Sequence, residues 1–231
     1  MTGGSQRIGR AICLSLAQRG FDIALHCNHS KKEASLLAAE ISRKGVRCEV
    51  FVCDLAKEKD VLLLLGKVRA KFPNLNVLIN NASIFIPSKF ERRDLKLFDA
   101  HWAINLKAPF ILSSDFARLC RQGQIINILD TKVTKNKTAH VAYILSKKSL
   151  HELTKLMAVE FAPRIRVNAV APGIILPPPG KGNSYLQKRA AQIPLKKAGD
   201  VRYITQSVEF LMDNDFVTGQ VIFADGGESL I

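Results

Sequence analysis

Four polar segments spread along the chain carry residue types that together can move a proton. They are Asn80-Asn81-Ala82-Ser83, Asn105, Asp130 and the pair Tyr143 and Lys147. On a helix, residues four apart share a face, so we expect the Lys147 ammonium beside the Tyr143 phenol. An adjacent ammonium favours the phenolate and lowers the pKa of a phenol, which is about 10 in model peptides. A tyrosine tuned in this way can give a proton to a substrate atom and recover it through solvent.

A glycine-rich turn, Thr2–Gly9 (TGGSQRIG), precedes a helical pattern at the start of the chain. Glycines allow positive φ angles and let a phosphate approach the backbone closely. The helix N-terminus then offers free N–H groups and a partial positive charge, and Arg7 adds a cation. The turn therefore predicts a pyrophosphate site formed by Gly3, Ser5, Gln6, Arg7, Ile8 and Gly9.

The loop that follows the next predicted strand bears on the choice of dinucleotide. An NAD site usually places an acid there, to bind the ribose 2′-hydroxyl. This chain has none: the candidates are His26, Asn28, His29 and Ser30, followed by Lys31 and Lys32. Donors and positive charge suit a 2′-phosphate, which favours NADPH, although the two lysines also fit a solvated first helical turn. No carboxylate or Cys completes a set with His26 and His29, so we expect no metal.

Asp54, with Leu55 beside it, follows a further predicted strand. Its position suits a hydrogen bond from the adenine amine. The alternative is an ordinary helix N-cap ahead of Glu58.

Short apolar runs alternate with helical patterns along the whole chain. The strand-like runs are Phe21–His26, Arg47–Val52, Val77–Asn80, Gln124–Leu129, Arg166–Val170 and Val221–Phe223. The helix-like segments are Ile8–Arg19, Lys31–Lys44, Glu58–Phe72, Phe98–Cys120, Tyr143–Phe161 and Val201–Met212. This alternation predicts an α/β fold over residues 1–231, a single domain with a doubly wound parallel sheet and helices on both faces. The Pro/Gly-rich Leu176–Asn183 is expected to be a loop near a site.

One position breaks this pattern. No residues precede the glycine-rich turn at Thr2 to form the central strand that the turn should follow. The sequence therefore leaves two alternatives: a start recorded too late, or a sheet that lacks an inner strand.

Composition limits the class of protein. The chain has 231 residues, 47% of them hydrophobic, and a formal charge of +14, which excludes a disordered chain and favours anionic partners. Five cysteines without C-x-x-C spacing indicate reduced thiols rather than a disulfide framework. With no signal peptide and no apolar stretch long enough for a membrane, we expect a cytoplasmic protein.

Taken together, these motifs resemble the short-chain dehydrogenase/reductase family over essentially the whole chain. Further family marks are Val167–Gly173 (VNAVAPG), Val217–Gln220 (VTGQ) and Asp225–Gly227 (DGG). The resemblance implies a Rossmann-like fold in which Asn105, Tyr143 and Lys147 are catalytic. Lys147 would also bind the nicotinamide ribose. Asn81, Ala82 and Ser83 would line the cofactor, and Pro172, Gly173 and Ile174 would pack on the nicotinamide. Homotetramers built on the two long helices are also implied.

Two departures narrow the resemblance to the pteridine reductase branch, which includes dihydromonapterin and dihydrofolate reductases. Arg7 replaces a usual glycine, and Asp130 replaces the usual catalytic serine. In that branch an aromatic residue, here Phe85, stacks on a pterin, and a serine, here Ser83, contacts it. Reducing a C=N bond needs a hydride at carbon and a proton at nitrogen. Asp130 and Tyr143 are placed to deliver the proton, and the nicotinamide would deliver the hydride. The expected substrate is a dihydropterin or dihydrofolate.

Two other functions remain open at this point. One is a different carbonyl reductase of the same fold, for example of 3-oxoacyl thioesters, against which Asp130 counts because a hydroxyl is the ordinary donor to a carbonyl oxygen. The other is a basic binding protein without catalysis. The Lys and Arg residues are scattered without an aromatic-interleaved stripe, so we expect no nucleic-acid partner.

Overall fold

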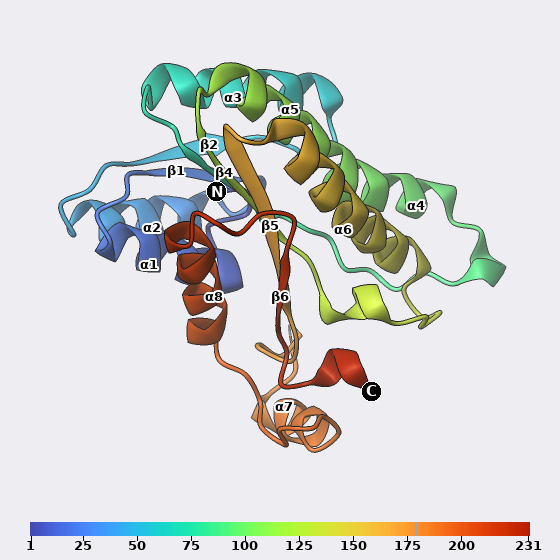
Figure 1. Cartoon of the computed structure of the whole chain (residues 1–231). Helices are drawn as coiled ribbons and strands as arrows, with labels where there is room; N and C mark the ends of the chain where they lie inside the picture. The colour runs from blue at the N-terminus through green and yellow to red at the C-terminus, as the bar shows by residue number, and fades with distance from the viewer. Residues whose placement is uncertain (179) are drawn as a thin grey trace.

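The structure is a computed structural model that describes residues 1–178 and 180–231 (Figure 1). The strands are β1 (Ile23–Cys27), β2 (Cys48–Val52), β3 (Val77–Asn80), β4 (Gly123–Ile128), β5 (Ile165–Pro172) and β6 (Val221–Ala224). The helices are α1 (Arg7–Gln18), α2 (Lys31–Ser42), α3 (Glu58–Lys71), α4 (Leu95–Trp102), α5 (Ala108–Leu119), α6 (Val141–Phe161), α7 (Asn183–Ala190) and α8 (Val201–Asp213). The predicted Rossmann-like α/β fold is confirmed.

All strand pairs are parallel, but they form two sheets. β1 pairs with β2, while β3, β4, β5 and β6 pair in that order. The carboxyl ends of parallel strands meet at one edge of a sheet. The loops after β1, β2, β3, β4 and β5, which carry the predicted site residues, therefore gather at that edge.

The first residues of the chain lie between the two sheets. The Met1 amino group donates to Ala24 O at 3.0 Å, and its burial lowers its pKa. The backbone N–H of Thr2 donates to Ile79 O at 3.0 Å. A cavity of about 270 Å³ continues from Met1 between Ile23 and Val77. Within the described residues no strand lies between β1 and β3.

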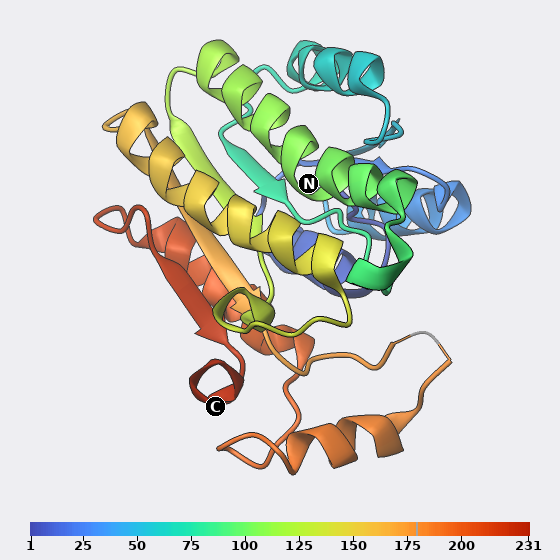
Figure 2. The ribbon, with the colours of Figure 1, turned by 90° about the vertical axis from the view of Figure 1, so that its right-hand side faces the viewer.

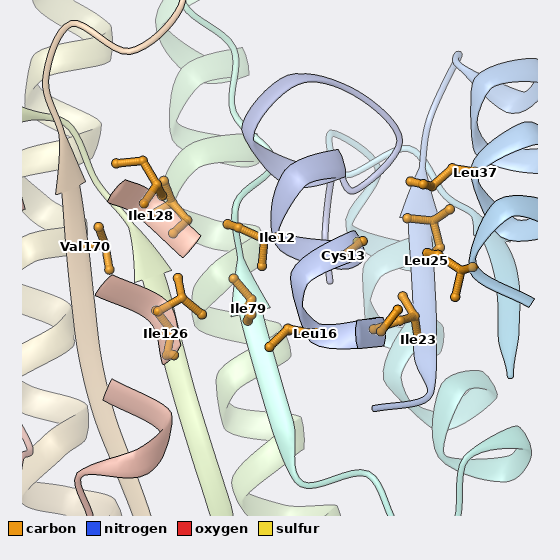
Figure 3. Close-up of a cluster of buried hydrophobic side chains, with 14 of the residues drawn as sticks. Ile12, Cys13, Leu16, Ile23, Leu25, Leu37, Ile79, Ile126, Ile128 and Val170 are labelled. Atoms are coloured by element: carbon orange, nitrogen blue, oxygen red, sulfur yellow. The ribbon is translucent and has the colours of Figure 1, made fainter. Parts of the chain in front are cut away.

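Helix α1 joins the two sheets through its buried face. Cys13 lies against the side chains of β1, whereas Ile12 and Leu16 point toward Ile79 of β3 (Figure 3). Ile12 and Cys13 are completely buried. Burial of such apolar surface provides about 25 cal/mol per Å², so this cluster takes over part of the cohesion that a shared inner strand would supply.

The opposite face of the sheets is covered by α3, α5 and α6, which share a second buried cluster. α5 and α6 run beside one another in Figure 2. The predicted helix Phe98–Cys120 begins earlier, at Leu95. It also contains a π-helical turn over Ala103–Lys107 between α4 and α5. Such turns often occur at functional sites, and this one contains Asn105.

The segment after β5 is loop-like, as predicted, up to Gly182, except that Pro179 lies outside the described residues. Helix α7, which follows at Asn183, was not predicted. Its polar residues give it no clear apolar face, so the sequence pattern offered little signal.

Candidate active site

The glycine-rich turn leaves helix α1 with an open N-terminus. No side chain caps the helix, and the first backbone bond of the helical pattern runs from Arg10 N to Gln6 O. The N–H groups of residues 5–9 have no hydrogen-bond partner in the part of the chain that the structure describes, so they are free to bind an anion. Gly3 has a φ of +58°, and a Cβ on Gly9 would overlap Gly3 O, so the turn needs glycine at both positions. This geometry fits a dinucleotide pyrophosphate.

His26 supports this turn rather than offering a donor to the cofactor, which corrects the sequence interpretation. Its Nδ1 accepts the Gly3 N–H at 3.1 Å, and its Nε2 donates to Cys53 O at 3.0 Å. Burial lowers the pKa of the ring to about 4, so His26 is neutral and both ring nitrogens are occupied.

The other residues predicted to bind the adenosine end lie together. Asn28 Nδ2 donates to Asp54 Oδ1 at 3.3 Å, and the Ser5 and Ser30 hydroxyls are 2.6 Å apart. His29, Lys31 and Lys32 are exposed, whereas Leu55 is buried. Asp54 does not cap α3, whose N-cap is Lys57, so the helix-cap alternative is wrong. The exposed donors and cations beside Ser30 fit a 2′-phosphate.

The segment after β3 is fastened to the turn. Asn81 Nδ2 donates to Thr2 O and Gly3 O, both at 3.0 Å, and the Ala82 N–H donates to the Thr2 hydroxyl at 3.1 Å. Across the site, Arg7 Nη2 donates to Pro177 O at 3.0 Å. Arg7 thus links the turn to the segment that follows β5.

Pro172, Gly173 and Ile174 continue directly from β5. Pro172 is buried, the Gly173 N–H donates to Ala224 O at 3.1 Å, and Ile174 O accepts from the Gly199 N–H at 2.8 Å. A Cβ on Gly173 would lie 2.6 Å from Asp225 Cα. Neighbouring backbone therefore fixes the path of this segment at the sheet edge.

Tyr143 and Asp130 form the centre of the candidate site. The Tyr143 hydroxyl donates to Asp130 Oδ2 at 2.7 Å, and Tyr143 is 5% exposed. Burial, together with the charge and hydrogen bond of Asp130, raises the pKa of the phenol well above its usual value. The sequence predicted a lowered pKa. That prediction is wrong, because the carboxylate favours the neutral phenol.

Lys147 does share the buried face of α6 with Tyr143, but its ammonium bonds elsewhere. Lys147 Nζ donates to Ile128 O at 2.7 Å. Burial lowers its pKa to about 8, partly opposed by the charge of Asp130. The i, i+4 spacing thus predicted the shared face correctly, whereas the pairing of the ammonium with the phenol was not found.

Asn105 organises the segment that carries Ser83 and Phe85. Its Oδ1 accepts from the Ile84 N–H at 2.9 Å and the Ser83 hydroxyl at 3.1 Å. Its Nδ2 donates to Ile84 O and to the Ser146 hydroxyl, each at 3.1 Å. Asn105 is completely buried, so in this structure it is a positioning residue, although the sequence suggested a catalytic role.

Phe85 presents an exposed ring beside the phenol. The two rings meet edge to face, with centroids 4.6 Å apart, and Phe85 is 47% exposed. The His140 ring stacks on the Phe85 ring, with centroids 4.2 Å apart and an angle of 5° between the ring planes. A backbone bridge between Ser88 and His140 holds the two loops together. One apolar ring surface therefore lies close to a protonated acid, an arrangement suited to a flat substrate.

Sequence reasoning missed three residues of this site. His140 supports Phe85, and Lys132 Nζ lies 3.2 Å from both Asp130 oxygens. His101 is buried and accepts the Ile86 N–H at 3.4 Å. A lysine two positions after Asp130 was a visible signal, but no periodic pattern pointed to either histidine.

Among the described residues, no group of His, Cys, Asp and Glu side chains could hold a metal ion. None of the helices they form is both long and apolar enough to cross a membrane.

Known proteins with similar sequences and structures identify the family of this chain. Residues 3–229 match a family model described as enoyl-(acyl carrier protein) reductase. The chain belongs to the short-chain dehydrogenase/reductase family.

Two related solved structures are FolM alternative dihydrofolate reductase 1 from Brucella suis and from Brucella canis, each in complex with NADP. Both are 36% identical in sequence. They have TM-scores of 0.95 and 0.93, and the matches cover 100% of this chain and 94% and 93% of theirs. A curated relative is the 3-oxoacyl-[acyl-carrier-protein] reductase FabG of Staphylococcus epidermidis. It is 33% identical over 98% of this chain and 96% of its own. The relatives thus include both activities that the sequence left open.

Proposed function

We propose that this chain is an NADPH-dependent reductase of a dihydropterin, such as dihydromonapterin, dihydrobiopterin or dihydrofolate. The observation that carries the proposal is the 2.7 Å hydrogen bond from Tyr143 to Asp130 beside the exposed ring of Phe85. A pterin is flat and polar, and fits between an aromatic ring and a nicotinamide. Similarity to two FolM dihydrofolate reductases that bind NADP supports both substrate class and cofactor.

The residues of the chain supply the proton and the geometry. NADPH, when bound, supplies the hydride to the carbon of the C=N bond. Tyr143, kept protonated by Asp130 and by burial, donates its proton to the nitrogen of that bond. The phenolate oxygen then recovers a proton from solvent through Asp130, whose side chain is 17% exposed. The C=N bond thus gains one hydride and one proton.

The second candidate is reduction of a 3-oxoacyl thioester, which similarity to FabG favours. A carbonyl oxygen that becomes an alkoxide is ordinarily stabilised by hydroxyl donors, and at position 130 the chain has a carboxylate in place of such a donor. The negative charge of Asp130 would disfavour that alkoxide. The site therefore suits a thioester less well than a dihydropterin.

Nicotinamide fluorescence distinguishes the candidates directly. Oxidation of NADPH is followed with dihydropterin, dihydrofolate and an acetoacetyl thioester in turn. We expect turnover with the first two and little with the thioester. If Asp130→Ser improves turnover of the dihydropterin, the assignment to the pteridine reductase branch fails.

We also propose that the chain forms homo-oligomers through α5 and α6, as the family resemblance implies. Phe110 and Leu156 are 51% and 68% exposed there, and they line a hollow of about 980 Å³. Light scattering of Leu156→Glu should show a smaller species than the unsubstituted chain. An unchanged mass would contradict this assembly.

A further inference from the structure

Lys132 forms an ion pair with Asp130, the residue that accepts the hydrogen bond of the proposed acid. Asp130 is the N-cap of the 3₁₀ turn Thr131–Thr134, and its Oδ1 accepts the Lys132 N–H at 2.8 Å. The Lys132 ammonium folds back onto the same carboxylate, 3.2 Å from each oxygen. Its side chain is still 25% exposed. The turn therefore holds a carboxylate and an ammonium side by side at the edge of the site.

The ammonium also lies over the Phe85 ring, which is proposed to stack on the substrate. Lys132 Nζ lies 5.2 Å from the Phe85 centroid. His140, stacked on Phe85, fixes the plane of that ring. A flat molecule that stacks on Phe85 must displace the ammonium from the ring face, which would leave Asp130 and Lys132 at one edge of that molecule.

The hydrogen-bonding capacity of this pair defines what that edge must contain. An ammonium has three donors, of which the carboxylate takes two; among the residues that the structure describes, Lys132 Nζ has no further hydrogen-bond partner. An ionised carboxylate only accepts, and Asp130 regains an acceptor position when Tyr143 turns to the substrate. One acceptor beside one donor complements a ring N–H beside a ring carbonyl.

We propose that Lys132 donates a hydrogen bond to the ring carbonyl of an oxo-pteridine while Asp130 accepts one from the neighbouring ring N–H. Lys132 is then a specificity-determining residue. The inference rests on the proposed function, because it concerns the orientation of that substrate. A diaminopteridine, in which an amino group replaces the carbonyl, would set a donor against the Lys132 ammonium. The site therefore selects pterins over their diamino analogues.

Binding to the full chain with saturating NADP⁺ tests the inference without catalysis. The probes are pterin and the corresponding diaminopteridine, followed by their own fluorescence. Lys132→Met removes the donor and keeps the apolar stem, whereas Lys132→Arg keeps a charged donor. Lys135→Met is the matched control, because Lys135 Nζ donates to Ser229 O at 3.1 Å and is in the same loop.

We expect Lys132→Met to weaken pterin binding about tenfold, the usual scale for one hydrogen bond to a charged group. Binding of the diaminopteridine should hold or improve, so that the ratio of the two dissociation constants shifts by at least that factor. Lys132→Arg should retain most of the preference for pterin, and Lys135→Met should leave it unchanged.

The outcomes separate the two proposals. If both heterocycles bind and their ratio is the same in Lys132→Met as in the unsubstituted chain, the assignment of Lys132 is overturned and the proposed function stands. An equal loss in Lys132→Arg and Lys132→Met also overturns it. If neither heterocycle binds the unsubstituted chain, the proposed function fails, and the inference fails with it.

Discussion

Two regions at the sheet edge differ in how their polar groups are bonded. We call the glycine-rich turn with the loop after β1 the nucleotide end, and the proposed proton-transfer residues Asp130, Tyr143 and Lys147 with Phe85 the catalytic end. At the nucleotide end, the N-terminus of α1 has no side-chain cap, and His29, Lys31 and Lys32 are exposed. At the catalytic end, the phenol, the carboxylate and the buried ammonium of Lys147 are bonded to groups of the chain itself.

This difference separates a preformed site from one that must rearrange. The backbone N–H groups of residues 5–9 have no partner in the part of the chain that the structure describes, so binding a phosphate there should cost little reorganisation. At the catalytic end, the Tyr143 hydroxyl must break its hydrogen bond to Asp130 and form one to the substrate before it can donate its proton. The first region should therefore control affinity for the cofactor, and the second the rate of reduction.

The sharpest test of this division is Tyr143→Phe. Removing the acid should lower kcat for a dihydropterin by about 10²- to 10⁴-fold, whereas the dissociation constant of NADPH should change little. Stopped-flow rates and nicotinamide fluorescence measure the two quantities, with Tyr203→Phe in α8 as the control. An unchanged rate of dihydropterin reduction would show that the phenol is not the acid.

The opposite result is expected from Gly9→Ala. Its methyl group would overlap Gly3 O within the turn, so the turn must shift and NADPH affinity should fall by about a hundredfold or more. The matched control is Gly66→Ala in α3, where nothing lies within 4 Å of the added methyl. That change should raise the melting temperature slightly, because alanine favours helix. Equal effects of the two variants on NADPH affinity would contradict a preformed turn.

The nucleotide end was also the more predictable of the two from sequence. The loop at His29 follows β1 and the segment at Asn81 follows β3, and parallel strands bring such positions to one edge whatever their other contacts. Local spacing therefore carried the information.

The catalytic end was predicted less well because its contacts are between distant segments. Tyr143 and Lys147 were expected to pair. Instead Asp130 accepts the hydrogen bond of the phenol, and Ile128 O accepts that of the Lys147 ammonium. The support of Phe85 by His140 depends on a bridge between loops about fifty residues apart. A pattern within one segment cannot show which group from a distant segment will accept a hydrogen bond.

The support of the nucleotide turn by His26 predicts a pH dependence of stability. The pKa of His26 is about 4 in the folded chain and 6.5 ordinarily, so the unfolded chain binds the additional proton between these values. Stability should be complete above about pH 6.5 and fall by about 3 kcal/mol as pH decreases to 4.

Urea unfolding across this range measures the loss, and His29→Gln, at an exposed position, should behave like the unsubstituted chain. His26→Gln should flatten the dependence. If that variant does not fold, NMR titration of the His26 ring in the unsubstituted chain gives the pKa directly. A ring that titrates near 6.5 would refute the role assigned to it.

At the catalytic end, Phe85→Ala tests whether the exposed ring binds the substrate. Loss of the aromatic surface should raise KM for a dihydropterin about tenfold, with the NADPH dissociation constant unchanged. Phe90→Ala is the control, because Phe90 is nearby in sequence and 70% exposed. A similar KM for both variants would remove the ring from the substrate site.

The smallest expected effect concerns strain in the nucleotide turn at Arg7, whose φ is +53°. A residue with a side chain is disfavoured in this region by roughly 1 kcal/mol relative to glycine. Arg7→Gln and Arg7→Gly both remove the bond to Pro177 O, but only the second relieves the strain. The Gly variant should therefore be more stable than the Gln variant by about 1 kcal/mol in urea unfolding. Both should bind NADPH a few-fold more weakly, since both lack the cation. Equal stabilities would mean that the turn holds no strain at Arg7, and its preformed shape would then derive from the glycines and His26 alone.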